Sequence, residues 1–192
     1  MNSSYSKNNY GEVFYNIIRS FRALVAVELG VLNGYSTYYI SKAIKDNEIG
    51  HLDSYDLWND YQYKHGNMEE VSKMLLENGL DSYVTLHKED AYEVCKKYAS
   101  DSVNFLHVDI SNTGDTVHRI MQDWDSKIQP GSIIVFEGGS EERDNIEWMV
   151  KYNKPSIKQA LNTNNIIEEK YIFCTYLKFP SLTVLLKKRN IL

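Results

Sequence analysis

Residues 27–34 read Val-Glu-Leu-Gly-Val-Leu-Asn-Gly, an acidic residue followed by two glycines. An apolar run over Ala23–Val27 leads into this stretch, and a segment with helical spacing opens shortly after it. The pattern predicts a buried parallel strand that turns sharply into a helix. Gly30 and Gly34 can adopt positive φ and let a ligand approach the main chain closely. An ordinary strand-to-helix turn without a ligand is the alternative.

The residue at position 28 indicates what kind of ligand such a turn would hold. The helix directs its unpaired N–H groups and the positive end of its dipole toward the turn. A carboxylate on Glu28 would repel a pyrophosphate there, but it suits a ligand that carries hydroxyls or an ammonium group. The sequence therefore favours a ligand-binding turn that is not a phosphate cradle.

Composition is typical of one globular domain: 192 residues, 43% hydrophobic, 24% charged, with a net charge of −5. The longest basic run is Lys187-Lys188-Arg189, which disfavours a nucleic-acid partner. Cys95 and Cys174 lack metal-ligand spacing, so we expect reduced, mostly buried thiols. Met1–Asn9 has no apolar signal core and no run approaches transmembrane length, which predicts a cytoplasmic protein without a membrane partner.

Hydrophobic periodicity predicts alternating strands and helices. We expect strands over residues 23–27, 50–56, 82–87, 103–108 and 132–136, and helices over 12–21, 36–45, 67–79, 91–98 and 115–128. Right-handed crossovers between parallel strands place helices on both faces of the sheet. The last apolar runs, 171–177 and 182–186, are too close for a crossover and must form a hairpin. The expected fold is α/β: a Rossmann-like, doubly wound, mostly parallel seven-stranded sheet with a C-terminal antiparallel hairpin.

Two regions follow from this pattern. Residues 1–22 form an N-terminal tail with a lid or packing helix, whose apolar stripe includes Phe14, Ile18 and Phe21. Residues 23–192 form one domain, since no linker, repeat or change in composition divides them.

From about Ala23 to the C-terminus, the chain resembles the class I S-adenosylmethionine-dependent methyltransferases. In that family an acidic-x-Gly-x-x-x-Gly turn holds the methionine part of the cofactor. The resemblance therefore implies cofactor-binding roles for Glu28, Gly30, Gly34 and the nearby Ser36.

The resemblance extends to the next two strands. A carboxylate at the end of the second strand binds the ribose hydroxyls in the family, and Asp56 fits that place, with Asp53 as the weaker alternative. Asp90 and Ala91 resemble the adenine-binding turn, although Asp90 also suits a plain helix cap. For Trp58 we expect core packing rather than a position over the adenine.

The nearest subgroup by resemblance is the small-molecule and sugar O-methyltransferases related to macrolide-sugar enzymes and cephalosporin hydroxylase-like proteins. The likeness rests on Leu106–Asp109 and Lys127–Glu137. These relatives often carry a Gly and a His shortly after the Asp that ends the fourth strand, which is Asp109 here. Metal-dependent members carry consecutive Asp residues or Asp-Asn after the fifth strand. This chain has Ile110-Ser111-Asn112 and a single carboxylate before two glycines instead. Mg²⁺ held by Asp109 and Glu137 stays open but is not favoured.

The implied activity is S-adenosylmethionine-dependent O-methylation of a small polar molecule, at a sugar-like or glycoside hydroxyl. Asp109 and Glu137 should lie in the crevice at the carboxyl ends of central strands. We expect one of them to orient or deprotonate the acceptor hydroxyl, and Asp109 also to contact the cofactor. We interpret His107 as a core residue and His118 as solvent-facing or capping, with a role as the base as its weaker alternative. For Glu141–Asp144 we expect a solvated charged loop, with a part in shaping the acceptor pocket as the weaker alternative.

Two other classes of function stay open at this point. A non-catalytic S-adenosylmethionine-binding module is motivated by the missing His and Asp-Asn pattern. An NAD(P)-dependent oxidoreductase is a weaker alternative, because Glu28, the glycine spacing and the terminal hairpin argue against it. The partner expected is a small-molecule acceptor, and the resemblance leaves a homodimer open.

Overall fold

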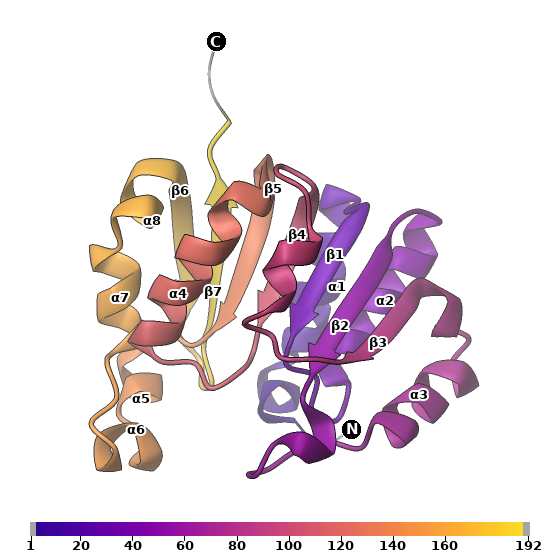
Figure 1. The fold of residues 1–192 in the computed structure, drawn as a ribbon, viewed down its shortest axis with the longest axis horizontal. Coiled ribbons are helices and arrows are strands. Elements are labelled where there is room, and N and C mark those ends of the chain that lie inside the picture. Colours follow the sequence, from indigo (N-terminus) through magenta and orange to yellow (C-terminus); the bar gives the residue numbers. More distant parts are fainter. Residues whose placement is uncertain (1–2, 190–192) are drawn as a thin grey trace.

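A single sheet with strand order β3-β2-β1-β4-β5-β7-β6 organises the computed structural model, which describes residues 3–189 (Figure 1). Strands β1 to β5 pair in parallel, whereas β7 runs antiparallel to both β5 and β6. The predicted seven-stranded sheet and its terminal hairpin are therefore confirmed. The strands are β1 Val25–Leu29, β2 His51–Asp56, β3 Val84–Lys88, β4 Val103–Val108, β5 Ile128–Glu137, β6 Tyr171–Tyr176 and β7 Leu182–Lys187.

Helices cover both faces of this sheet, as predicted. The helices are α1 Tyr10–Phe21, α2 Tyr35–Asn47, α3 Met68–Glu77, α4 Gly114–Trp124, α5 Glu141–Asp144, α6 Glu147–Lys151, α7 Ile157–Thr163 and α8 Asn165–Lys170. Apolar side chains of α1, α2 and α3 pack into one core cluster, and those of α4, α7 and α8 pack into another. In Figure 1, α1 and α2 lie behind the sheet and α4 lies in front of it. The chain order switches between β1 and β4, which places a ligand crevice at the carboxyl ends of these strands.

Two predicted elements differ in the structure. The helix expected over residues 91–98 is only a short 3₁₀ turn, Val94–Lys97. Strand β5 begins at Ile128, before Pro130, rather than at Ser132. The register of β4 against β5 shifts between Val103 and Phe105, so the extra residues of β5 bulge away from the ladder. A proline is tolerated at such a bulge because no ladder hydrogen bond is required of it.

The four short helices between β5 and β6 were not expected from the sequence. Their apolar stripes are too short for a clear period, and three of them, α5, α7 and α8, start at a single capping side chain. Ser140 and Ser156 accept hydrogen bonds from the backbone N–H groups of Arg143 and Gln159, and Asn164 caps α8 in the same way. These Ser and Asn caps are the sequence signal from which the helices could have been predicted.

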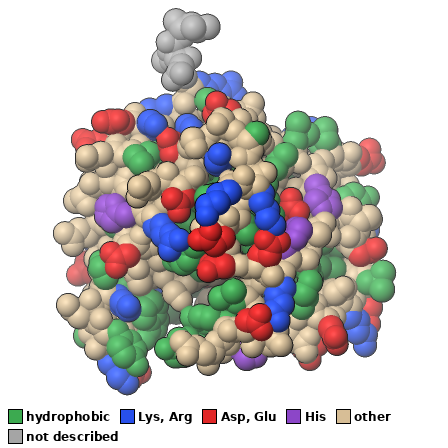
Figure 2. Space-filling model, viewed as in Figure 1, with side chains coloured by type: hydrophobic (Ala, Val, Ile, Leu, Met, Phe, Trp, Pro, Cys, Tyr) green, Lys and Arg blue, Asp and Glu red, His purple; other side chains and the backbone are tan. Residues whose placement is uncertain are grey.

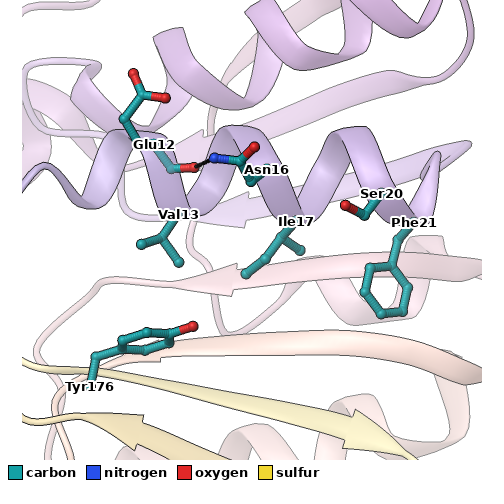
Figure 3. Close-up of a pocket in the computed structure, with 7 residues that line it drawn as sticks. All are labelled: Glu12, Val13, Asn16, Ile17, Ser20, Phe21 and Tyr176. Carbon is teal, nitrogen blue, oxygen red and sulfur yellow. Dashed lines mark hydrogen bonds between the residues drawn. The ribbon is translucent and has the colours of Figure 1, made fainter.

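Helix α1 packs on α2 through Phe14 and Ile18, which are fully buried. Phe21, also expected in the buried stripe, is 48% exposed. The outer side of α1 and Tyr176 line a shallow groove of about 380 Å³ (Figure 3).

The surface in Figure 2 shows acidic and basic side chains intermixed over that face. Cys95 is buried as expected, but Cys174 is exposed because it lies on β6, the edge strand. Within the described residues, no helix is long and apolar enough to span a membrane.

Asp125, in η5 (Asp125–Lys127), places a buried carboxylate beside residues of α8, β6 and β7. Asp125 accepts hydrogen bonds from Lys170 and Tyr171, and Lys187 lies 3.3 Å from its carboxylate. Burial opposes ionisation, but the hydrogen bonds from Lys170 and Tyr171 and the charge of Lys187 outweigh it, so the pKa of Asp125 is lowered. The ionised side chain therefore stabilises the folded state.

We predict that Asp125→Asn lowers the free energy of unfolding at pH 7 by about 1–3 kcal/mol, the usual range for hydrogen bonds to a charged group. Because the pKa is lowered on folding, the contribution is complete above the unfolded pKa of about 4 and declines as the pH falls through the folded value. Urea denaturation should give similar differences at pH 7 and pH 5 and a smaller one at pH 3. Asp123→Asn, which removes an exposed ion pair with Arg119, is the matched control with an effect below about 1 kcal/mol. A difference that grows toward low pH would contradict this account.

Candidate active site

The turn between β1 and α2 has the backbone conformation that the sequence predicts. Gly30 and Gly34 have φ values of +93° and +73°. A Cβ on Gly30 would lie 2.0 Å from the carbonyl oxygen of Asp109, and one on Gly34 would lie 2.8 Å from Val71. Both glycines are therefore required by packing within the protein itself. Ser36 lies buried in the first turn of α2, which begins directly after Gly34.

Glu28 lies at the centre of a buried polar cluster below this turn. Its Oε2 accepts hydrogen bonds from the hydroxyls of Thr37 (2.6 Å) and Ser54 (2.8 Å), and its Oε1 lies 3.2 Å from Nδ1 of His107. The side chain has no exposed surface. The structure thus gives Glu28 a supporting position, with its carboxylate enclosed by protein, rather than the ligand-facing one that the sequence suggests. It ties α2 and β2 to β1.

Asp56 lies at the tip of β2 and is half-buried. Its Oδ2 accepts from the backbone N–H groups of Val31 (2.8 Å) and Leu32 (3.0 Å), and its Oδ1 accepts from Trp58 (2.8 Å). A carboxylate offers about four lone-pair positions, so one stays available on Oδ1. Asp53, by contrast, lies inside the strand and contacts His87 at 2.8 Å. Of the two acids, only Asp56 contacts the turn after β1.

The segment after β3 forms a turn held by its own side chain. Asp90 is exposed, and its Oδ1 accepts from the backbone N–H of Tyr92 at 2.9 Å. Ala91 is buried in the core cluster beside α4. Contact of either residue with an adenine stays a prediction.

Trp58 is buried, and its ring N–H donates to the carbonyl of His87, which confirms the packing role expected for it.

A cavity of about 910 Å³ opens next to the turn after β1 and the tips of β2 and β3. Asn33, Trp58, Asn59, Lys88 and residues of α3 line it. It adjoins the same edge of the sheet as Asp56 and has room for part of a cofactor.

Asp109 and Glu137 lie side by side at the ends of β4 and β5, as predicted, because Val108 pairs with Phe136. Glu137 is 6% exposed. Burial and the charge of Asp109 raise the pKa of Glu137 to about 7. Burial also raises the pKa of Asp109.

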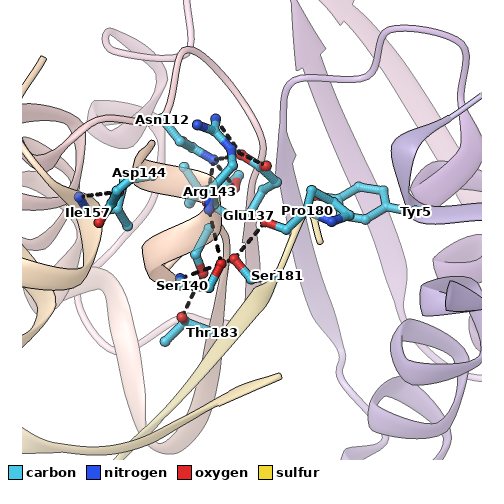
Figure 4. A network of polar contacts seen from close by, with 12 residues as sticks. Tyr5, Asn112, Glu137, Ser140, Arg143, Asp144, Ile157, Pro180, Ser181 and Thr183 are labelled. Carbon is cyan, nitrogen blue, oxygen red and sulfur yellow. Dashed lines mark hydrogen bonds and ion pairs between the residues drawn. The ribbon is translucent and has the colours of Figure 1, made fainter. Parts of the chain in front are cut away.

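Arg143 of α5, which the sequence interpretation placed in a solvated loop, is buried against Glu137 (Figure 4). Its Nε and Nη2 donate to the two carboxylate oxygens of Glu137 at 2.6 and 2.9 Å. Glu141 and Glu142 in the same segment are exposed as expected. Arg143 turns inward because the Ser140 cap and the two glycines after β5 reverse the chain over the strand end.

Asn112 is the second residue that the sequence interpretation missed. Its Nδ2 donates to the carbonyl oxygens of Val108 and Glu137, both at 3.0 Å, which fixes the orientation of the amide. Its position three residues after Asp109, in the segment that follows β4, was the available signal.

Tyr5, in η1 (Ser4–Asn8), closes the other side of this edge. It is 1% exposed, and its hydroxyl lies 3.3 Å from Nε2 of His107. Burial, followed by the charges of Asp109 and Glu137, raises the pKa of Tyr5. His107 is fully buried between Tyr5 and Glu28, which confirms its interpretation as a core residue. His118 is exposed, and its Nδ1 lies 2.9 Å from the Asn164 amide.

The arrangement around Glu137 does not fit a divalent cation. Both oxygens that would ligate the ion accept hydrogen bonds from Arg143 instead. Gly138 and Gly139, which follow, bring no side-chain oxygen. Among residues 3–189, no group of three or more His, Cys, Asp or Glu side chains is placed to hold a metal.

We predict that Thr37→Val, which keeps the shape but removes one donor to Glu28, lowers the free energy of unfolding by about 1–3 kcal/mol. The cost arises because a buried carboxylate loses a hydrogen bond that nothing replaces. Ser41→Ala is the control on the same helix, since its hydroxyl only bonds the backbone of the preceding turn. Urea denaturation compares the two. Equal losses in the two variants would show that the hydrogen bond from Thr37 to Glu28 stabilises the fold no more than a hydroxyl bonded to the helix backbone does.

Comparison with known proteins agrees with this geometry. Residues 27–137, more than half of the chain, match the family described as "Methyltransferase domain". No curated protein sequence is a match.

Solved structures share the fold at low sequence identity. The O-methyltransferase TomG of Streptomyces achromogenes, solved with SAM, has a TM-score of 0.70 at 14% identity, over 94% of this chain and 80% of that one. The O-methyltransferase of Bacillus cereus, solved with SAH, has a TM-score of 0.71 at 12% identity, over 94% and 81%. The methyltransferase PaMTH1 of Podospora anserina, also with SAH, has a TM-score of 0.70 at 14% identity, over 98% and 80%.

Proposed function

The chain belongs to the methyltransferase domain family and is an S-adenosylmethionine-dependent methyltransferase, and from that premise we propose that it methylates a hydroxyl of a small polar, sugar-like molecule. The observation that carries the proposal is the pair Asp109 and Glu137 at adjacent strand ends, with raised pKa values. A carboxylate with a raised pKa is a suitable base for a hydroxyl proton. Membership of the family sets aside the oxidoreductase alternative.

The cofactor would lie across the edge formed by β1 and β2. The turn from Gly30 to Gly34 and the N-terminus of α2 would face its methionine part, and the available lone pair of Asp56 would accept from a ribose hydroxyl. When bound, the cofactor supplies an electrophilic methyl group on a positively charged sulfur. The chemistry of these groups fits it: the open acceptor is a carboxylate, and the cofactor carries hydroxyls and a positive charge.

Asp109 is the better placed of the two acids to take the proton. Both oxygens of Glu137 already accept from Arg143, whereas Asp109 is half-buried at the end of β4. In the proposed reaction the acceptor hydroxyl oxygen would bond to the methyl carbon while the bond from that carbon to sulfur breaks. S-adenosylhomocysteine would leave, and the hydroxyl proton would pass to the Asp109 carboxylate. Glu137 then keeps Arg143 oriented. Tyr5 and the residues around it exclude water from this side.

We predict that the wild-type protein binds S-adenosylmethionine and that Asp56→Asn weakens the affinity at least about tenfold, the equivalent of one charge-assisted hydrogen bond. Asp53→Asn is the matched control, because it removes an equal charge from the same strand away from the turn. Isothermal titration calorimetry measures both. Absence of binding to the folded wild type would remove the proposed function, and a larger loss in the Asp53 variant would move the ribose contact to Asp53.

We also predict that Asp109→Asn lowers kcat about 10²- to 10⁴-fold, the usual contribution of a general base. The wild-type rate should rise with pH through the raised pKa of Asp109, because only the ionised form accepts a proton, and the variant should lack this rise. The assay follows tritiated methyl transfer from S-adenosylmethionine to a panel of sugars and methyl glycosides. Asp101→Asn, on the exposed loop before β4, is the control. An Asp109→Asn variant with wild-type rate and pH profile would contradict the role.

A further inference from the structure

Two buried polar atoms near Glu137 have no hydrogen-bond partner among the described residues: Oδ1 of Asn112 and Nη1 of Arg143. Both side chains are deeply buried, with residue exposures of 0% for Asn112 and 5% for Arg143. Leaving a buried donor or acceptor unsatisfied is unfavourable, so such pairs usually mark a place where a ligand or water completes the bonding. The other polar atoms that fix the two side chains are hydrogen-bonded, through Nδ2 of Asn112 and through Nε and Nη2 of Arg143. One acceptor, Oδ1 of Asn112, and one donor group, Nη1 of Arg143, are left without a partner.

The two open atoms belong to side chains that flank the same carboxylate. Nη2 of Arg143 lies 2.9 Å from Oε2 of Glu137, and Nδ2 of Asn112 lies 3.5 Å from that same oxygen. Figure 4 shows the guanidinium and the amide side by side above Glu137. The centre of the Trp148 ring on α6 lies 5.4 Å from the guanidinium carbon of Arg143. Both side chains are therefore held in place, with one donor and one acceptor left over.

A donor next to an acceptor selects the chemistry of its ligand. A hydroxyl placed between the two side chains would accept from Nη1 of Arg143 and donate to Oδ1 of Asn112. A carboxylate or phosphate has no proton for Oδ1, and an ammonium has no lone pair for Nη1. Charge adds to this selection, because Glu137 already neutralises Arg143 and Asp109 adds a nearby carboxylate. An anion would therefore meet no net positive charge from the ion pair of Arg143 with Glu137.

We propose that Arg143 and Asn112 form a subsite for a neutral hydroxyl of the methyl acceptor, with the guanidinium fixed on Glu137 in the place where a bound cation would otherwise act. That the ligand of this subsite is the methyl acceptor rests on the proposed function. It makes recognition of the acceptor independent of divalent metal. It also makes Arg143 and Asn112 specificity-determining residues that separate neutral alcohols from charged analogues.

The test reads Arg143 directly by NMR of protein labelled with ¹⁵N-arginine, saturated with S-adenosylhomocysteine. The Arg143 side-chain signal is assigned by its loss in Arg143→Lys. Three probes are titrated: methyl α-glucopyranoside, glucuronate and glucosamine, first with EDTA and then with Mg²⁺. We expect the neutral glycoside to shift the Arg143 signal with the same affinity under both conditions, and the charged probes to bind at least about tenfold more weakly.

Variants then test the specificity. Arg143→Lys keeps the charge on Glu137 but removes Nη1, so KM for the neutral acceptor should rise at least about tenfold while the affinity for S-adenosylmethionine stays within about twofold. Arg119→Lys, an exposed arginine on α4, is the matched control and should change neither value.

Three results overturn the proposal: no response of the Arg143 signal to the neutral glycoside, tighter binding of glucuronate or glucosamine, or binding that requires Mg²⁺. Failure of the proposed function is read separately, because it appears as absent S-adenosylmethionine binding or absent methyl transfer in the calorimetric and radiochemical assays. The NMR titration itself is made on the wild type and needs no turnover; Arg143→Lys serves it only to assign the signal.

Discussion

Burial of charged groups where β1, β4 and β5 end is the constraint on which the rest of this structure depends. A carboxylate in a dry interior is unfavourable unless hydrogen bonds or an opposite charge accompany it. Glu28 meets this condition through Thr37 of α2 and Ser54 of β2, and Glu137 meets it through Arg143 of α5. Elements far apart in the sequence are therefore fixed around one edge of the sheet, because each supplies a partner that a buried carboxylate needs.

This pairing divides the edge into two functional sides. On the side of β1 and β2, Glu28 lies below the turn, and Asp56 accepts hydrogen bonds from it at the tip of β2. One lone-pair position on Oδ1 of Asp56 is left for a hydroxylated ligand. On the side of β4 and β5, Asp109 lies next to the ion pair of Glu137 with Arg143. A methyl donor on the first side and a hydroxyl acceptor on the second would meet over Asp109. The fixed guanidinium gives the acceptor side a positive group without a metal ion.

The sequence predicted the sheet because buried strands read as short apolar runs. The runs of β1, β2, β4 and β5 each lead to an acid, namely Glu28, Asp56, Asp109 and Glu137. It also predicted Asp109 and Glu137 together, since parallel strands bring their carboxyl ends to one edge. Arg143 could not be found this way. Its contact with Glu137 depends on the two positive-φ glycines after β5 and on a four-residue helix, and neither leaves a periodic signal. The inward direction of Glu28 was missed for a related reason: its partners come from three separate elements.

The crystal structure of the protein with S-adenosylhomocysteine, grown with Mn²⁺, tests the central claim most directly, because Mn²⁺ is located by its anomalous scattering. The account predicts the ligand's methionine part above Gly30 and Gly34 and its ribose on Asp56. It further predicts that Arg143 stays paired with both oxygens of Glu137, with no manganese between Asp109 and Glu137. A manganese ion at that position with Arg143 turned away, or a ligand bound elsewhere on the sheet, would contradict it.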